Sequence, residues 1–153
     1  MIKKIITSRD FILFGIIIFG VVVVGIANPF FVQPSSLSDV LTDTSILIIL
    51  ALSQMIVILI RAIDLSVASN LALSGMLISL LSTVYPELPV IFFIILSCSI
   101  GTFLGVLNGV SIAILKVPFI VTTLGTLSIY RGLIYFVSDG KQVYSSEFSE
   151  DFL

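Results

Sequence analysis

Side chains that could perform chemistry are few in this chain, and they do not form a catalytic set. Histidine is absent and Cys98 is the single cysteine, so the sequence offers neither a Cys/His zinc site nor a disulfide. The pair Gly140-Lys141 lacks the glycine five positions earlier that a phosphate-binding loop requires, because Tyr135 stands there. We therefore predict no enzyme activity, no metal site and no cofactor bound by this chain.

Most of the polar residues lie inside long apolar runs. A lipid-facing Asn108 would leave its amide without hydrogen bonds, so we expect it to face protein or a wet cavity. It could bond a neighbouring helix or contact a hydroxyl group of a solute. Thr122, Thr123 and Thr126 can satisfy their hydroxyls on their own helix. We take these threonines, together with Asn108, as candidates for the side of a path that faces a polar solute.

Three charged residues are interpreted as structural. Arg61 and Asp64 are three positions apart, which makes them neighbours on a helix, and we expect them to pair at a helix end. Alternatively Asp64, with Ser66 and Ser69, caps the helix that follows. Arg131 either reaches the membrane interface through its long aliphatic stem or forms a salt bridge between helices.

Three glycines recur every fourth residue, at Gly101, Gly105 and Gly109. On a helix they form one smooth strip, which predicts close packing against another helix in lipid. Flexibility, or room for a passing solute, is the alternative. Tyr130 and Tyr135 fit an interfacial aromatic belt.

The amino-acid composition indicates that most of the protein surface faces lipid and not water. The chain has 153 residues, of which 58% are hydrophobic and 10% charged, whereas soluble domains carry about 25% charge. So few charges cannot cover a soluble surface, and we predict an all-α integral membrane protein. The sequence has no basic patch, which argues against a nucleic-acid partner.

The apolar runs predict about five transmembrane helices in one domain, 1–153, followed by a polar outer tail at 138–153. The predicted spans are 11–27, 46–63, 66–84, 90–115 and 119–137. A cleaved signal peptide is the alternative for 11–27. Segment 28–45 is predicted to be a loop, with a short interfacial helix capped by Ser36 or Ser38.

The basic residues predict the orientation of the chain. Lys3, Lys4 and Arg9 place the N-terminus in the cytoplasm, and five crossings then return Arg61 and Lys116 to that side. The loops 28–45 and 85–89, which lack Lys and Arg, fall outside, as does the tail.

Four segments resemble, in order and spacing, the permease family of bacterial ABC importers for ribose, xylose, galactose, rhamnose and autoinducer-2. They are 63–67 (IDLSV), 107–109 (LNG), 116–126 (KVPFIVTTLGT) and 130–133 (YRGL). Arg61-Ala62 and 67–69 (VAS) replace the glycines of many members, which favours the rhamnose and autoinducer-2 branches. Family members are twice as long, with roughly ten helices, so the chain resembles the N-terminal half of such a permease, a partial bundle.

The resemblance implies a permease component in the bacterial inner membrane that imports a sugar or sugar-like solute. Its implied partners are a second permease subunit, ATPase subunits that use the ATP, and an extracytoplasmic sugar-binding protein. Two alternatives stay open. One is a half-size secondary transporter or channel subunit acting as a dimer. The other is a membrane anchor that transports nothing.

Overall fold

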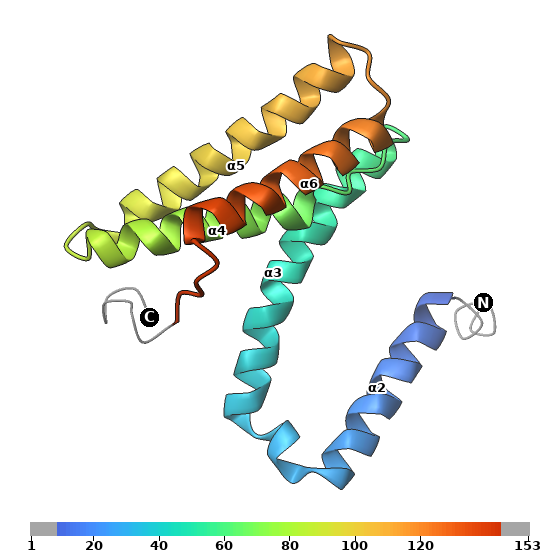
Figure 1. Cartoon of the computed structure of the whole chain (residues 1–153). Coiled ribbons are helices and arrows are strands. Elements are labelled where there is room, and N and C mark those ends of the chain that lie inside the picture. The colour runs from blue at the N-terminus through green and yellow to red at the C-terminus, as the bar shows by residue number, and fades with distance from the viewer. Residues whose placement is uncertain (1–8, 145–153) are drawn as a thin grey trace. The chain divides into compact units, whose positions relative to one another are not determined.

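The computed structural model describes residues 9–144, and every regular element in that range is helical (Figure 1). Lys3, Lys4 and the tail from 145 onward lie outside the described residues. The chain divides into two units after Ala51, within α3, and each is treated by itself. The elements are α2 (Arg9–Ala27), the 3-10 helix η1 (Pro29–Val32), α3 (Pro34–Leu59), α4 (Val67–Val84), α5 (Val90–Ala113) and α6 (Phe119–Ser138).

In the first unit, a short capped turn connects α2 with the beginning of α3. The Asn28 side chain accepts a hydrogen bond from the backbone amide of Phe30 at 3.1 Å. The Ser36 hydroxyl donates to the Phe30 carbonyl at 2.8 Å, which ties η1 to the first turn of α3. Proline is tolerated at the first position of a helix, where its missing amide hydrogen has no partner to lose, and α3 begins at Pro34.

The predicted loop 28–45 is wrong over most of its length, because residues 34–45 are helical. The short helix expected within it is instead the first part of α3, which begins at Pro34 and continues into the next apolar run. Their hydroxyl groups bond back to the helix and do not interrupt it. Thr42 donates to the carbonyl of Ser38 at 3.0 Å, and Ser45 donates to that of Thr42 at 2.7 Å. The predicted span 46–63, which follows this segment, also ends too late, because α3 ends at Leu59 and not at Ile63.

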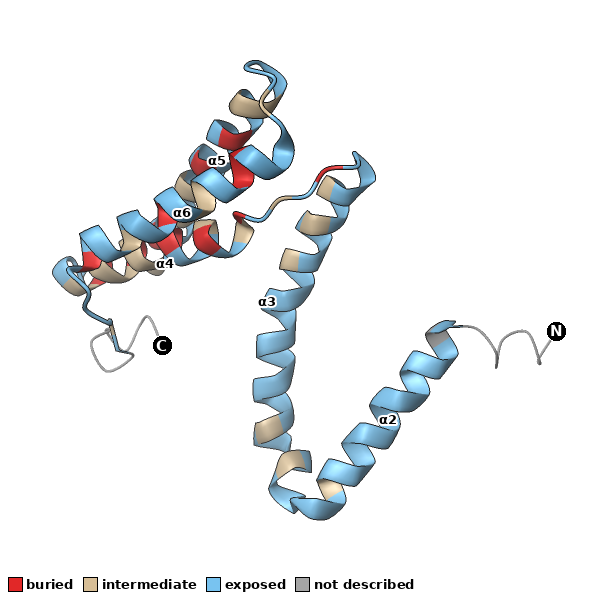
Figure 2. Cartoon of the chain, turned by 45° about the vertical axis from the view of Figure 1, so that its right-hand side comes forward, coloured by how far each residue is buried: buried red, intermediate tan, exposed pale blue. Residues whose placement is uncertain are grey.

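Within residues 9–144, four helices, α3 to α6, are long and apolar enough to cross a bilayer, and the apolar part of α2, Phe11–Ala27, is shorter. At about 1.5 Å per residue these lengths are those of membrane spans. Figure 2 shows exposed residues over most of the helix surfaces, and many of them are large and apolar. Such a surface suits lipid or further protein, so the all-α, multi-pass membrane class is confirmed. The orientation in the membrane remains a prediction.

Helices α4, α5 and α6 pack together in the second unit (Figure 2). The buried face of α4 consists mainly of serines, which let helix backbones approach closely: Ser69, Leu73, Ser74, Ile78 and Ser82. Long-range hydrogen bonds between described residues also join these helices. The Asn70 amide donates to the Gly101 carbonyl at 3.2 Å, and the Tyr130 hydroxyl donates to the Leu104 carbonyl at 2.8 Å.

The prediction that Tyr130 belongs to an interfacial belt is wrong. Its side chain is only 2% exposed and packs with Leu73 and Leu104 in the centre of the bundle. A buried tyrosine needs a partner for its hydroxyl, and the Leu104 carbonyl supplies one. Tyr135 is exposed, as an interfacial residue would be.

Candidate functional site

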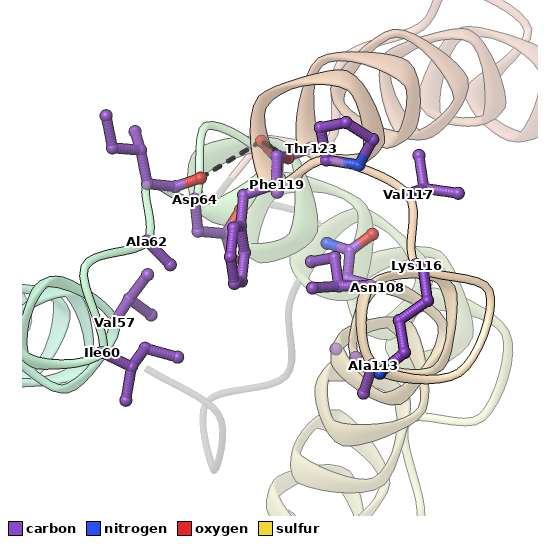
Figure 3. Close-up of a pocket in the computed structure, with 15 residues that line it drawn as sticks. Val57, Ile60, Ala62, Asp64, Asn108, Ala113, Lys116, Val117, Phe119 and Thr123 are labelled. Atoms are coloured by element: carbon purple, nitrogen blue, oxygen red, sulfur yellow. Dashed lines mark hydrogen bonds between the residues drawn. The ribbon is translucent and has the colours of Figure 1, made fainter.

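A cavity that bears on the predicted site lies at one end of the second unit and measures about 630 Å³. Figure 3 shows its walls, which come from the end of α3, the α3–α4 connection, α5, the α5–α6 connection and the start of α6. Most lining side chains are aliphatic. The polar ones are Asp64, Asn108, Lys116 and Thr123, and the glycines are Gly105 and Gly109.

The α3–α4 connection is folded by hydrogen bonds of its own backbone and side chains. The amide of Ala62 donates to the Val57 carbonyl at 3.1 Å, and Arg61 adopts a left-handed backbone with φ of 58°. The carboxylate of Asp64 then accepts from both the amide and the hydroxyl of Ser66, at 2.8 and 2.7 Å. The connection is thus an ordered wall of the cavity.

These contacts correct the prediction of a helical Arg61–Asp64 pair. Residues 60–66 are not helical, so a separation of three does not make the two side chains neighbours. Asp64 instead accepts from the amide of Ser66 at the start of α4, which fits its part in the alternative capping arrangement, but the Ser66 side chain makes no cap hydrogen bond to that helix. Ser69 takes part differently, because its hydroxyl donates to the Ser66 carbonyl at 2.7 Å.

Asn108 links this connection to α5. Its amide nitrogen donates to the Ser66 hydroxyl oxygen at 2.7 Å, and the side chain is 5% exposed. The Ser66 hydroxyl uses its one proton on Asp64, so its oxygen is left to accept, and the NH₂ side of the Asn108 amide must face it. The carbonyl Oδ1 of Asn108 is buried without a partner among the described residues.

The three candidate threonines lie in different surroundings. Thr123 lines the cavity, is 1% exposed, and donates to the carbonyls of Phe119 at 2.9 Å and Ile63 at 3.4 Å. Thr122 is buried, and its hydroxyl has no partner among the described residues. Thr126 is half-buried and bonds back to the Thr122 carbonyl at 3.1 Å. The cavity therefore brings together Asn108 and Thr123, whereas Thr122 and Thr126 do not line it.

The glycine strip divides into two parts. At Gly101, an added Cβ would meet the Ser74 hydroxyl at 3.7 Å and the Asn70 side chain at 3.8 Å, so α4 packs here. At Gly105 and Gly109, it would meet nothing within 4 Å among the described residues. Both of these glycines face the cavity, and a packing role for them stays a prediction.

Arg131 lies outside the cavity walls. It is exposed on α6, and its reach to the membrane interface stays a prediction. Among residues 9–144, no group of three or more acidic, cysteine or histidine side chains could hold a metal ion.

Sequence reasoning missed two features of this region. Ser66 is predicted to cap a helix, whereas its hydroxyl is the junction between Asp64 and Asn108. The sequence marks Lys116 as an orienting charge and as part of a family-like segment, whereas the structure gives it a left-handed backbone with φ of 59° and a place on the cavity wall. The Ser66 junction has no local sequence signal, because Asn108 lies 42 positions away, and the cavity that Lys116 lines is formed by segments distant along the chain.

A comparison with family models matches residues 36–152 to the family described as "Branched-chain amino acid transport system / permease component". Among curated proteins, a ribose import permease of Haemophilus influenzae is 36% identical over 92% of this chain and 42% of its own length. Autoinducer 2 import permeases of Photorhabdus luminescens and Enterobacter sp. are 39% and 34% identical, over 68% and 92% of this chain.

The chain spans less than half the length of these relatives, since it covers 31% and 40% of the two autoinducer 2 permeases. No solved structure matches it.

Proposed function

This chain belongs to the family of permease components of the branched-chain amino acid transport type, and we propose that it forms part of an ABC importer for a sugar or sugar-like solute. The observation that carries the proposal is the similarity to a ribose import permease, which extends over 92% of this chain. The similarity to autoinducer 2 permeases supports the same class of solute. The transport path would cross the bacterial cytoplasmic membrane.

The proposed importer includes further polypeptide in addition to this chain. The relatives carry more than half of their length outside the matched region, so we expect a competent permease to contain that further length as well. A second permease subunit, separate ATPase subunits that bind the ATP and an extracytoplasmic sugar-binding protein would complete the importer. The energy for transport would come from the ATPase subunits.

Asn108 is our first candidate for a residue on the solute path. It lines the cavity, it is held in one orientation by Ser66, and its Oδ1 has no partner among the described residues. A hydroxyl group of a sugar is a donor of the kind this acceptor lacks. Thr123 is the second candidate because it lines the same cavity, although its hydroxyl already bonds to backbone carbonyls.

Uptake by a chimeric permease tests the proposal. This chain would replace the matched part of the H. influenzae ribose permease, in cells that lack that permease but keep its ATPase and binding protein. We expect uptake of labelled ribose or autoinducer 2 that disappears when the ATPase is inactivated. Asn108→Leu should reduce this uptake, whereas Ser99→Ala, which removes an exposed hydroxyl bonded to its own helix, should not.

Two results would contradict the proposal. If the chimera inserts into the membrane at a normal level but imports neither solute, the importer assignment fails. Uptake that persists without a working ATPase would instead favour a secondary transporter or channel.

A further inference from the structure

Two cationic residues lie just beyond the C-terminal ends of two helices. Arg61 follows α3, which ends at Leu59, and Lys116 follows α5, which ends at Ala113. Both have left-handed backbones, with φ of 58° and 59°. Glycine or asparagine adopts this conformation at lower cost than a long side chain does. The two cations therefore stand where the local backbone does not favour them.

The two connections that carry these cations lie at the same end of the second unit. A smaller cavity of about 250 Å³ is lined by Arg61, and the larger cavity is lined by Lys116. The two cavities share four lining residues: Ala62, Ile63, Pro118 and Phe119. Figure 3 shows Lys116 and Phe119 on the wall of the larger cavity. Two cations thus border one continuous stretch of apolar side chains.

Within the described residues, neither cationic side chain is already engaged by another group. Both residues are exposed, and neither side chain has a hydrogen-bond or ion-pair partner there. The nearby anion on these walls is Asp64, whose Oδ1 is engaged by the amide and hydroxyl of Ser66. A cation at a helix C-terminus is favoured by the helix dipole, but that interaction needs no apolar groove beside it.

We propose that Arg61 and Lys116 bind the headgroup of an anionic phospholipid whose acyl chain lies against Ile63, Phe119 and Ile120. The chemistry of the walls selects this ligand. Free phosphate would match the cations but would leave the apolar wall uncovered, whereas a phospholipid carries both the anion and the hydrocarbon. Basic pockets between membrane helices bind anionic headgroups in this way. The proposal does not depend on the chain being a transporter. The acyl chain would lie on the wall shared with the smaller cavity, which neither Asn108 nor Thr123 lines, so it would not contact these two candidates for the solute path.

Lipid binding to the purified full chain tests the proposal. We would measure the thermal unfolding midpoint in detergent with added phosphatidylglycerol, phosphatidylcholine or inorganic phosphate, and count retained lipids by native mass spectrometry. Arg61→Asn and Lys116→Asn remove the charge while keeping a residue that tolerates the left-handed backbone. Lys141→Asn is the matched control, because it removes one exposed positive charge that lines neither cavity.

We expect phosphatidylglycerol, and not phosphatidylcholine or phosphate, to raise the midpoint of the wild type. Each of the two cavity variants should weaken phosphatidylglycerol binding about fivefold, the factor expected for one cation near a membrane surface. Lys141→Asn should bind as the wild type does.

Several results would overturn the proposal. Equal stabilisation by phosphatidylcholine would show that the headgroup charge is irrelevant, and equal stabilisation by inorganic phosphate would identify a free-anion site. An equal loss in Lys141→Asn would show an effect of net charge alone. Unchanged phosphatidylglycerol binding in Arg61→Asn and Lys116→Asn would show that these cations do not hold the headgroup. If an asparagine variant does not fold, Arg61→Gly or Lys116→Gly takes its place, and unchanged binding in it would overturn the proposal in the same way.

Discussion

The side-chain amide of Asn108 donates to the hydroxyl of Ser66 over 2.7 Å and a separation of 42 positions in the sequence. Ser66 in turn donates to Asp64, so one short chain of hydrogen bonds ties α5 to the non-helical connection before α4. Membrane helices gain little from the hydrophobic effect against one another, so polar contacts of this kind carry much of the packing specificity.

The Asn108–Ser66 bond should be measurable as a coupling energy. We expect Asn108→Ala and Ser66→Ala each to destabilise the chain, and the double variant to lose less than the sum of the two. The coupling should be about 0.6–1.7 kcal/mol, the range for hydrogen bonds between membrane helices. The free energy of unfolding of the wild type, the two single variants and the double variant would be measured in mixed micelles titrated with SDS. Additive effects would show that the bond contributes nothing.

Tyr130→Phe should lower the free energy of unfolding by about 1 kcal/mol, because it leaves the buried carbonyl of Leu104 without the hydroxyl that now bonds it at 2.8 Å. Tyr135→Phe is the matched control, since this ring is 74% exposed. The same unfolding measurement applies to both variants. Equal effects would argue against the buried hydrogen bond.

Leucine substitutions should separate the two parts of the glycine strip. Gly101→Leu introduces a large side chain where α4 already lies within 4 Å of an added Cβ, and we expect a loss of about 1–3 kcal/mol from overpacking. Gly105→Leu should be tolerated in this chain, because an added Cβ there meets nothing within 4 Å among the described residues. A comparable loss at Gly105 would show that this position is packed.

Alanine substitutions of two glycines in the last part of α6 and just after it should have opposite signs. Gly132→Ala lies inside the helix with open space around it, so it should stabilise the chain by about 0.5–1 kcal/mol. Gly140→Ala should destabilise it by about 1 kcal/mol or more. Its φ is 70°, and an added Cβ would meet the Tyr135 ring at 3.3 Å. Thermal midpoints of both variants would check the difference in sign.

The sequence alone was sufficient for the class of protein and for the helices α4, α5 and α6, whose ends lie within two residues of the predicted ones. Their apolar runs are long and bounded by prolines or charged residues, which are local signals. The same reasoning fails at residues 34–45, where the polar composition predicts a loop but the chain is helical. Hydroxyl side chains can bond to their own helix, so composition alone does not exclude a helix there.

The tertiary structure decided which polar residues meet. Sequence spacing predicted that Asp64 pairs with Arg61, but the chain leaves the helix after Leu59 and Asp64 bonds Ser66 instead. It also placed Tyr130 at the centre of the bundle and divided the glycines between a helix contact and a cavity wall. The physical reason is that periodicity along one helix gives the direction of a side chain relative to that helix. The partner in that direction comes from another segment, which the same periodicity does not contain.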